Sequence, residues 1–188
     1  MLKAPREGFV KTRLAKDVGQ VEAVKIYRRL VEHQLQQIPS DWTTHVAYAP
    51  DDAAAEMPAW LGPEIQYFPQ SPGTLGDRLI AALAQLPKPV IFLGGDCPAL
   101  DTDRLLAAAT ALESADVVIW PAVDGGYCLI GLAKDLPEVF EKITWGTESV
   151  LEETLVQIPT GARVHLCQPP LEDIDDLPSW ERRPAALR

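Results

Sequence analysis

The acidic residue Asp96 stands where a carboxylate can bind a metal ion. It follows the continuously apolar run Val90–Leu93 and two glycines, Gly94 and Gly95. Such a run is typical of a strand buried on both faces, and ligands of open α/β sheets bind beyond the carboxyl ends of the strands. A carboxylate there suits a hard cation such as Mg²⁺ or Mn²⁺, and Gly95 would let a ligand approach the backbone. The alternative is that Asp96 only caps a turn.

A short basic segment near the N-terminus could bind an anion. Residues 3–14 read as a loop that contains Pro and Gly and precedes a predicted helix. Backbone N–H groups and two cations in such a loop could wrap phosphates. The alternative is a solvated basic terminus, because short basic motifs often match by chance. The candidate phosphate-binding residues are Gly8, Lys11, Thr12 and Arg13.

A third candidate cluster lies between two apolar runs, at Asp124-Gly125-Gly126. Asp124 could bind a hydroxyl group or act as a base, while Gly125 and Gly126 would admit a substrate. Asp-Gly between apolar runs is also the strongest short-range signal for a β-hairpin. A purely structural turn is therefore an equal alternative at this position.

Periodic segments must position these clusters. Alternating strands and helices predict an α/β fold with a mostly parallel central sheet between two layers of helices. Apolar steps of three and four residues predict a helix over 20–38, with the stripe Val21, Val24, Tyr27, Val31, Leu35 and Ile38. Further helices are expected at 75–86, 102–112 and 147–158, and strands at 45–49, 65–68, 90–93, 117–120, 127–132 and 163–167. From about Trp180 we expect a loose polar tail.

Composition bounds the class of protein. A chain of 188 residues fits one domain, residues 1–188. Its formal net charge is −10, although residues 1–16 hold five basic residues and one acidic residue, so the body of the chain is acidic. An acidic body repels a polyanion, which argues against a nucleic-acid partner. One short basic segment is better matched to one small anionic group.

The sequence also predicts no membrane association and a cytoplasmic location. No apolar run approaches the roughly 20 residues of a membrane helix, and the N-terminus lacks the apolar region of a secretory signal. The three cysteines Cys97, Cys128 and Cys167 are widely spaced, which argues against a disulfide framework or a structural zinc site. With no histidine beside it in the sequence, Cys97 is interpreted as a small packing residue.

Six segments, taken in chain order, resemble a known family. They are KAPREGFVKTRLA, PGTLGDRL, GGDCPAL, PAVDGGYCLIGL, ITWGTESVLEETL and LEDIDDL. Together they resemble the bacterial family of uncharacterised, glycosyltransferase-like proteins with a GT-A (nucleotide-diphospho-sugar transferase) fold. Relatives of that family include guanylyltransferases of the molybdenum-cofactor and phospholactate type. The resemblance spans about residues 3–177 and implies a Rossmann-like sheet with a nucleotide in its cleft and a divalent metal bridging the phosphates.

The resemblance also implies roles for individual residues. Lys11 and Arg13 would contact a diphosphate or triphosphate, and Asp96 stands in the family's D-x-P element. Asp173 and Asp175 stand in a D-I-D element that often supplies a second metal ligand. Arg78 is a candidate for the substrate or base side.

The chain departs from the family pattern at two places. Only Met1-Leu2 precede the basic loop, so we expect a truncated first strand. Relatives have W-S-T where this chain has Trp145-Gly146-Thr147, and we expect Trp145 to be a core residue.

The leading hypothesis is a metal-dependent transferase that uses a nucleotide donor and a small-molecule acceptor. Mg²⁺ or Mn²⁺ on Asp96 and Asp175 would neutralise phosphate charge. With a nucleotide-sugar donor, Asp124 could deprotonate the acceptor hydroxyl; with a nucleoside triphosphate, an acceptor phosphate would attack the α-phosphorus. Two alternatives stay open. One is a non-catalytic nucleotide-binding regulatory or scaffold protein, and the other is a module whose residues 3–16 dock an acidic partner protein.

Overall fold

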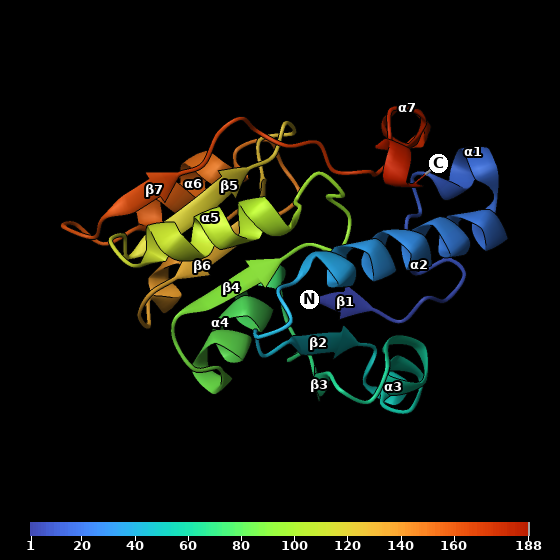
Figure 1. Ribbon diagram of the computed structural model, residues 1–188, viewed down its shortest axis with the longest axis horizontal. Coiled ribbons are helices and arrows are strands. Elements are labelled where there is room, and N and C mark those ends of the chain that lie inside the picture. The colour runs from blue at the N-terminus through green and yellow to red at the C-terminus, as the bar shows by residue number, and fades with distance from the viewer. Residues whose placement is uncertain (188) are drawn as a thin grey trace. The chain divides into compact units, whose positions relative to one another are not determined.

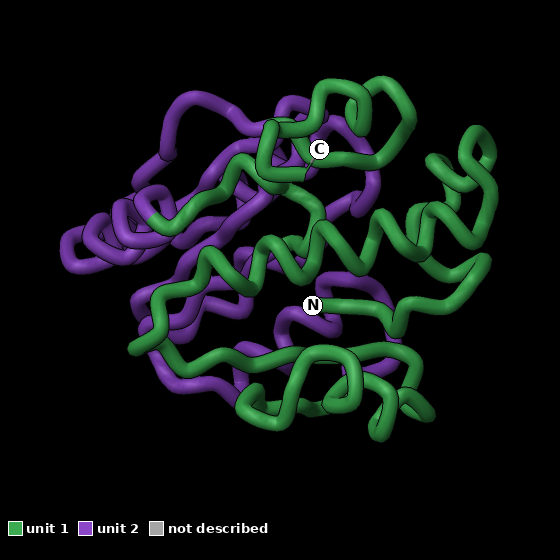
Figure 2. Tube along the Cα trace, turned by 45° about the vertical axis from the view of Figure 1, so that its right-hand side comes forward, with its two compact units in different colours: residues 1–69, 94–102, 172–188 green, residues 70–93, 103–171 purple. Residues whose placement is uncertain are grey.

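The strands of the computed structural model, which describes residues 1–187, form two hydrogen-bonded sheets (Figure 1). Each sheet belongs to one of two units. Unit 1 comprises residues 1–69, 94–102 and the chain from 172 onward; unit 2 comprises residues 70–93 and 103–171. The chain therefore passes between the units four times, and Figure 2 colours the two units separately. The prediction that residues 1–188 are one domain stays a prediction.

Unit 1 contains a parallel sheet of three strands in the order β1-β2-β3. The first strand is short, as expected, but it is present and pairs with β2, with Leu2 opposite Tyr48 and Lys3 opposite Ala49. The elements of unit 1 are β1 (Leu2–Lys3), α1 (Ala15–Val18), α2 (Gln20–Gln37), β2 (His45–Ala49), η1 (Asp51–Ala53), α3 (Glu56–Leu61), β3 (Gln66–Pro69), α7 (Leu177–Glu181) and η3 (Ala185–Leu187).

Helix α2 organises unit 1 because it buries two faces. Tyr27 and Val31 pack with Leu2 of β1, and the Tyr27 hydroxyl donates to the Lys3 carbonyl oxygen at 2.9 Å. The predicted helix is confirmed, but the predicted stripe is incomplete. Its first residue, Val21, is 57% exposed, and Ile26, which the stripe omitted, is buried in a second apolar cluster.

The C-terminal residues form that second cluster, so the expected loose tail is wrong. Trp180 is 8% exposed and Leu187 is 4% exposed. Both pack in one apolar cluster with residues of α2 and of the segment before α1, because a large apolar side chain is stabilised by removal from water. The buried members of this cluster are Leu14, Ile26, Leu30, Ile174, Trp180 and Leu187.

Unit 2 contains a mixed sheet in the order β4-β6-β5-β7. Strand β6 is antiparallel to both neighbours, whereas β5 and β7 are parallel. Helix α5 packs close to this sheet, since a Cβ added at Gly131 of β6 would lie 2.9 Å from Leu112 Cδ1. The elements are α4 (Leu75–Gln85), β4 (Val90–Leu93), α5 (Thr102–Leu112), β5 (Val117–Pro121), β6 (Tyr127–Leu132), η2 (Pro137–Phe140), α6 (Val150–Gln157) and β7 (Val164–Leu166).

The predicted α/β class is confirmed, with two refinements. Hydrogen bonds divide the strands between two sheets instead of one central sheet. Helix α6 begins at Val150 instead of residue 147, because the hydroxyls of Thr147 and Ser149 hydrogen-bond to each other and to the Thr144 carbonyl and Glu153 carboxylate. None of the helices in the described residues is long and apolar enough to span a bilayer.

Candidate functional site

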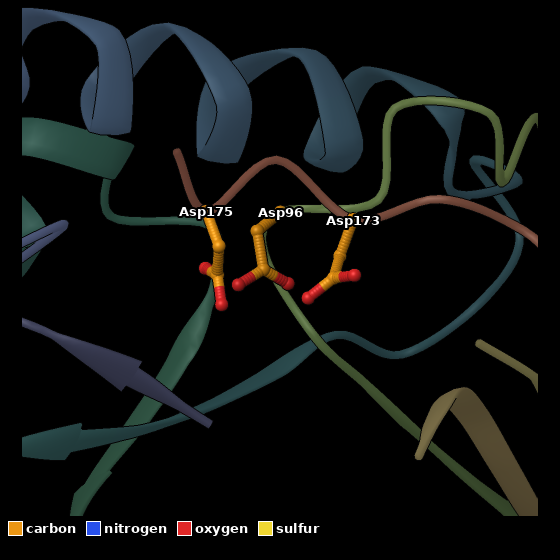
Figure 3. Close-up of side chains that lie close together, drawn as sticks. All are labelled: Asp96, Asp173 and Asp175. Atoms are coloured by element: carbon orange, nitrogen blue, oxygen red, sulfur yellow. The ribbon is translucent and has the colours of Figure 1, made fainter. Parts of the chain in front are cut away.

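Three carboxylates converge in unit 1, on side chains that two separate segments carry. Asp96 lies in the loop after β4, while Asp173 and Asp175 lie in the segment before α7. Figure 3 shows all three carboxylates pointing to the same side of these segments. One carboxylate oxygen from each residue lies within 4.8 Å of the others. The structure therefore brings together the three residues to which the family resemblance assigned a metal, and their role as metal ligands stays a prediction.

The buried residue Ile174 holds the two segments together. Its side chain is 2% exposed in the apolar cluster with Trp180, and its backbone N–H donates to the carbonyl oxygen of Asp96 at 2.9 Å. Burial of Ile174 therefore fixes the middle of the Asp173–Asp175 segment beside the loop that carries Asp96.

Ser179 holds the Asp175 side of the site, and sequence reasoning missed this residue. Its Oγ accepts hydrogen bonds from the backbone N–H groups of Asp175 and Asp176, each at 3.1 Å. Asp176 caps α7 in return by accepting from the Ser179 N–H at 2.9 Å. The pattern of Asp176, a proline at Pro178 and a hydroxyl at Ser179 is a helix-start signature that could have revealed this arrangement.

Lys11 places a positive charge directly between two of the carboxylates. Its Nζ lies 2.9 Å from Asp96 Oδ2 and 2.8 Å from Asp175 Oδ1, and the side chain is only 5% exposed. Burial by itself lowers the pKa of Lys11, but attraction to Asp96 and Asp175 outweighs it, so the pKa is raised. The ammonium group is therefore charged at neutral pH and acts as the counterion of the cluster.

The backbone around Lys11 is held in an unusual conformation. Lys11 has φ 44°, in the left-handed region that costs a residue with a side chain about 1 kcal/mol. The neighbours Val10 and Leu14 are 4% and 0% exposed, and each is buried in a different apolar cluster. These two anchors hold the segment between them, which presents Lys11 to the carboxylates.

The other candidate residues of the basic segment, and Arg6, have different surroundings. Arg13 Nη1 lies 3.5 Å from Asp175 Oδ2 with its side chain 71% exposed, so its guanidinium also faces solvent. Thr12 and Gly8 are exposed, and no atom lies within 4 Å of a Cβ added at Gly8. Arg6 pairs with Asp52 and Glu56 at 2.8 and 2.9 Å.

These internal pairs argue against the interpretation of residues 3–16 as an arm that docks an acidic partner. Lys11 and Arg6 already contact carboxylates of this chain. A partner would have to displace those carboxylates to use either cation.

The donor set of the cluster fits a hard divalent cation. Mg²⁺ and Mn²⁺ prefer carboxylate oxygens, and a few carboxylates together with substrate phosphates and water complete their coordination. Asp96, Asp173 and Asp175 provide such oxygens. The Lys11 ammonium between two of them acts as a stand-in cation and shows that this position attracts positive charge.

Gly95 has a packing role that differs from the one we expected. A Cβ added at Gly95 would lie 2.8 Å from Leu2 Cδ2 and 3.0 Å from Val31 Cγ2. The absence of a side chain therefore lets this loop lie against β1 and α2. That packing explains the glycine without a ligand, and its predicted contact with a nucleotide stays a prediction.

The remaining candidates lie in unit 2 and have structural partners there. Asp124 Oδ1 accepts a hydrogen bond from the Gly126 N–H at 2.9 Å. This bond closes a turn, which the Asp-Gly pattern also predicts. Gly125 has φ 91°, and an added Cβ would lie 2.1 Å from the Glu148 carbonyl oxygen. Arg78 donates to the Gly73 carbonyl oxygen at 3.1 Å and to Gln70 Oε1 at 3.2 Å.

The structure thus explains Asp124, Gly125 and Gly126 as parts of one turn, and Arg78 as a residue of α4 that hydrogen-bonds to the turn before that helix. Their roles toward a substrate stay predictions. Trp145 is half-buried and meets the Tyr127 ring edge-on, with the ring centroids 6.3 Å apart, which agrees with a packing role.

Comparison with known proteins places the chain among bacterial relatives. The family model described as an uncharacterised protein conserved in bacteria (DUF2064) matches residues 33–147. The chain is 34% identical to a provisionally assigned nucleotide-diphospho-sugar transferase from Desulfovibrio desulfuricans G20, with a TM-score of 0.85. That similarity covers 93% of this chain and 81% of that one. A search of curated proteins found no match.

Two more distant structures share the fold. The 4-diphosphocytidyl-2C-methyl-D-erythritol synthase from Anaerococcus prevotii DSM 20548 is 12% identical, with a TM-score of 0.59 over 97% of this chain and 96% of that one. The homologue of Mycobacterium tuberculosis rv0371c from Mycobacterium sp. strain JC1 is 14% identical, with a TM-score of 0.58 over 81% and 80%. At these identities the likeness shows the fold alone, and it confirms the fold class predicted from the six motifs.

Proposed function

We propose that this chain, which belongs to the DUF2064 family of bacterial proteins, is a metal-dependent transferase with a nucleotide donor and a small-molecule acceptor. The chain has a transferase-like fold. The observation that carries the finer proposal is the convergence of Asp96, Asp173 and Asp175 with the Lys11 ammonium. Acidic and basic groups gathered at one point suit a ligand that brings both a metal and phosphates.

The carboxylates and the cations would bind different parts of such a ligand. Asp96, Asp173 and Asp175 would hold Mg²⁺ or Mn²⁺, which when bound neutralises charge on phosphate oxygens and on the leaving group. Arg13 would bind a phosphate through two parallel N–H donors, because its planar guanidinium matches two oxygens. Its exposed side chain supports this role.

Two kinds of donor fit this set of groups. With a nucleotide-sugar, the acceptor oxygen attacks the anomeric carbon of the sugar and the nucleoside diphosphate leaves. The proton of the acceptor hydroxyl passes to a base, for which we propose the exposed carboxylate of Asp124. With a nucleoside triphosphate, an acceptor phosphate attacks the α-phosphorus and pyrophosphate leaves. The D. desulfuricans relative is named for nucleotide-diphospho-sugars, which favours the first kind of donor for this chain.

The first experiment is a thermal-shift panel of nucleoside triphosphates, nucleoside diphosphates and nucleotide-sugars, each with Mg²⁺, Mn²⁺ or EDTA. A ligand at a hundred times its dissociation constant stabilises the folded state by about 2.7 kcal/mol. For a chain of this size the melting temperature should rise by about 5–10 °C. We expect that rise with one class of donor, and only when a metal is present.

The matched variants are Asp96→Asn and Asp41→Asn. Both remove one negative charge from unit 1, but Asp41 is exposed and lies outside the carboxylate cluster. Asp96→Asn should abolish the metal-dependent part of the shift, whereas Asp41→Asn should leave it intact. Unchanged nucleotide affinity of Asp96→Asn with metal present would disprove the metal assignment.

Product analysis separates the enzyme from the non-catalytic alternative. The donor that gives the largest shift is incubated with a panel of sugars, sugar phosphates and other hydroxyl compounds, and the released nucleotide is measured. We expect acceptor-dependent release that Asp96→Asn abolishes. Tight donor binding without release for any acceptor would favour a regulatory or scaffold protein.

A further inference from the structure

We propose that Lys11 is an internal counterion that exchanges with the divalent metal. In the metal-free protein its ammonium neutralises Asp96 and Asp175, and metal binding frees it to face the anionic ligand. This inference rests on the metal site of the proposed function. It adds that the metal and Lys11 compete for the same carboxylate oxygens. The Lys11 ammonium therefore becomes available to bind a phosphate only after the metal has bound.

The contacts of Lys11 support direct competition. Its Nζ lies 2.9 Å from Asp96 Oδ2 and 2.8 Å from Asp175 Oδ1. Asp96 and Asp175 also belong to the three-carboxylate cluster that could hold a metal. A metal ion bonds carboxylate oxygens at about 2.1 Å. An ion on these two oxygens would therefore lie close to the ammonium, and repulsion between the two cations favours one occupant at a time.

The surroundings of Lys11 make this competition strong. Its side chain is 5% exposed, so water screens the ion pairs less than it would at the surface. Arg13 pairs with Asp175 at the longer distance of 3.5 Å, and its side chain is 71% exposed. Lys11 is therefore the cation whose removal should change the metal affinity most among the basic residues of this loop.

The lysine side chain is also suited to moving. Its ammonium is a point charge on a flexible four-carbon stem, while the backbone at Lys11 is anchored by the buried neighbours Val10 and Leu14. The charge can therefore leave the carboxylates without movement of the loop. A phosphate group at the same place would then meet a free ammonium instead of one already neutralised.

The primary test measures Mn²⁺ binding to the full chain, without nucleotide, by calorimetry. Lys11→Met keeps most of the aliphatic stem and removes the charge. Lys16→Met is the matched control, because Lys16 is an exposed lysine in the same segment. We expect Lys11→Met to bind Mn²⁺ about 5–150-fold more tightly than the unmodified chain, which is the usual range for coupled sites, and Lys16→Met to change the affinity less than twofold.

A second measurement uses the unmodified chain and so does not depend on a variant folding. Amine acylation is followed at each lysine by mass spectrometry, with and without saturating Mn²⁺. Lys11 should react slowly in the metal-free protein because it is buried and paired. Mn²⁺ should raise its labelling severalfold and leave the labelling of Lys16 unchanged.

The outcomes separate this inference from the proposed function. Tighter Mn²⁺ binding by Lys11→Met together with metal-induced labelling of Lys11 supports the exchange. Mn²⁺ binding by the unmodified chain that Lys11→Met leaves equal or weakens, with unchanged labelling, overturns the exchange but keeps the metal site. If neither protein binds Mn²⁺, the metal site itself fails and the exchange fails with it.

Discussion

The hydroxyl of Ser179 accepts a hydrogen bond from the backbone N–H of Asp175 at 3.1 Å. This contact links a carboxylate of the candidate metal site to the first turn of α7. The helix is in turn held by Trp180, which is buried in the apolar cluster of α2. The C-terminal segment therefore belongs to the site, because the position of Asp175 depends on it.

Replacing Ser179 by alanine should weaken metal binding more than it weakens the fold. Loss of an interaction that orients a metal ligand typically costs about tenfold or more in metal affinity, whereas loss of a helix cap costs about 1 kcal/mol of stability. Mn²⁺ calorimetry and urea unfolding measure the two effects. Ser114→Ala, at an exposed serine, is the control, and an unchanged Mn²⁺ affinity in Ser179→Ala would show that Ser179 does not position Asp175.

The turn at Gly125 should tolerate a side chain far less than the turn at Gly146. Both glycines have positive φ, 91° and 85°, but an added Cβ would lie 2.1 Å from the Glu148 carbonyl oxygen only at Gly125. Gly146→Ala should cost about 1–2 kcal/mol for its backbone conformation. Gly125→Ala should cost about 1–3 kcal/mol more because of the overlap. Equal losses of unfolding free energy would contradict this account.

The stability contributed by Asp116 should disappear in acid. The Arg163 backbone N–H and then Lys134 contact its carboxylate, at 2.8 and 3.1 Å, and lower the pKa of Asp116. A carboxyl with a lowered folded-state pKa stabilises the fold above its unfolded pKa of about 3.9, and that stability is lost as the pH falls through the folded-state pKa.

Asp116→Ala should therefore unfold at lower urea than the unmodified chain at pH 7, and this difference should shrink from about pH 5 downward. Asp41→Ala, at an exposed aspartate, should show little difference at any pH. A gap for Asp116→Ala that stays constant down to pH 2 would mean that its ionised form is not the stabilising species.

The two units should unfold together in one transition. Each unit is assembled from separate chain segments, and the chain passes between them four times, so neither unit is one continuous segment that could fold by itself. Trp42, Trp60 and Trp180 report on unit 1, and Trp120 and Trp145 on unit 2. Variants that keep the tryptophans of one unit should give the same urea midpoint as variants that keep those of the other. Two distinct midpoints would show that the units are separate domains.

Local sequence patterns predicted most of the elements because secondary structure follows from short-range periodicity. Strand β4 was predicted with the bounds Val90–Leu93 that it has, because a short, continuously apolar run between prolines and glycines is typical of a buried strand. The second buried face of α2 was missed. Ile26 and Leu30 pack on Trp180 and Leu187, and the apolar stripe of one helix does not reveal a partner that follows more than a hundred residues later.

The sequence alone also determined which residue types could form the site, because Asp96 and the Asp173-Ile174-Asp175 segment carry hard oxygen ligands and Lys11 and Arg13 carry positive charge. Only the tertiary structure decided which of these groups meet. Lys11 lies 85 residues before Asp96 and 164 before Asp175, and burial of Val10, Leu14 and Ile174 brings the three together. Local patterns do not encode such contacts, because they depend on how distant apolar clusters close around the charged groups between them.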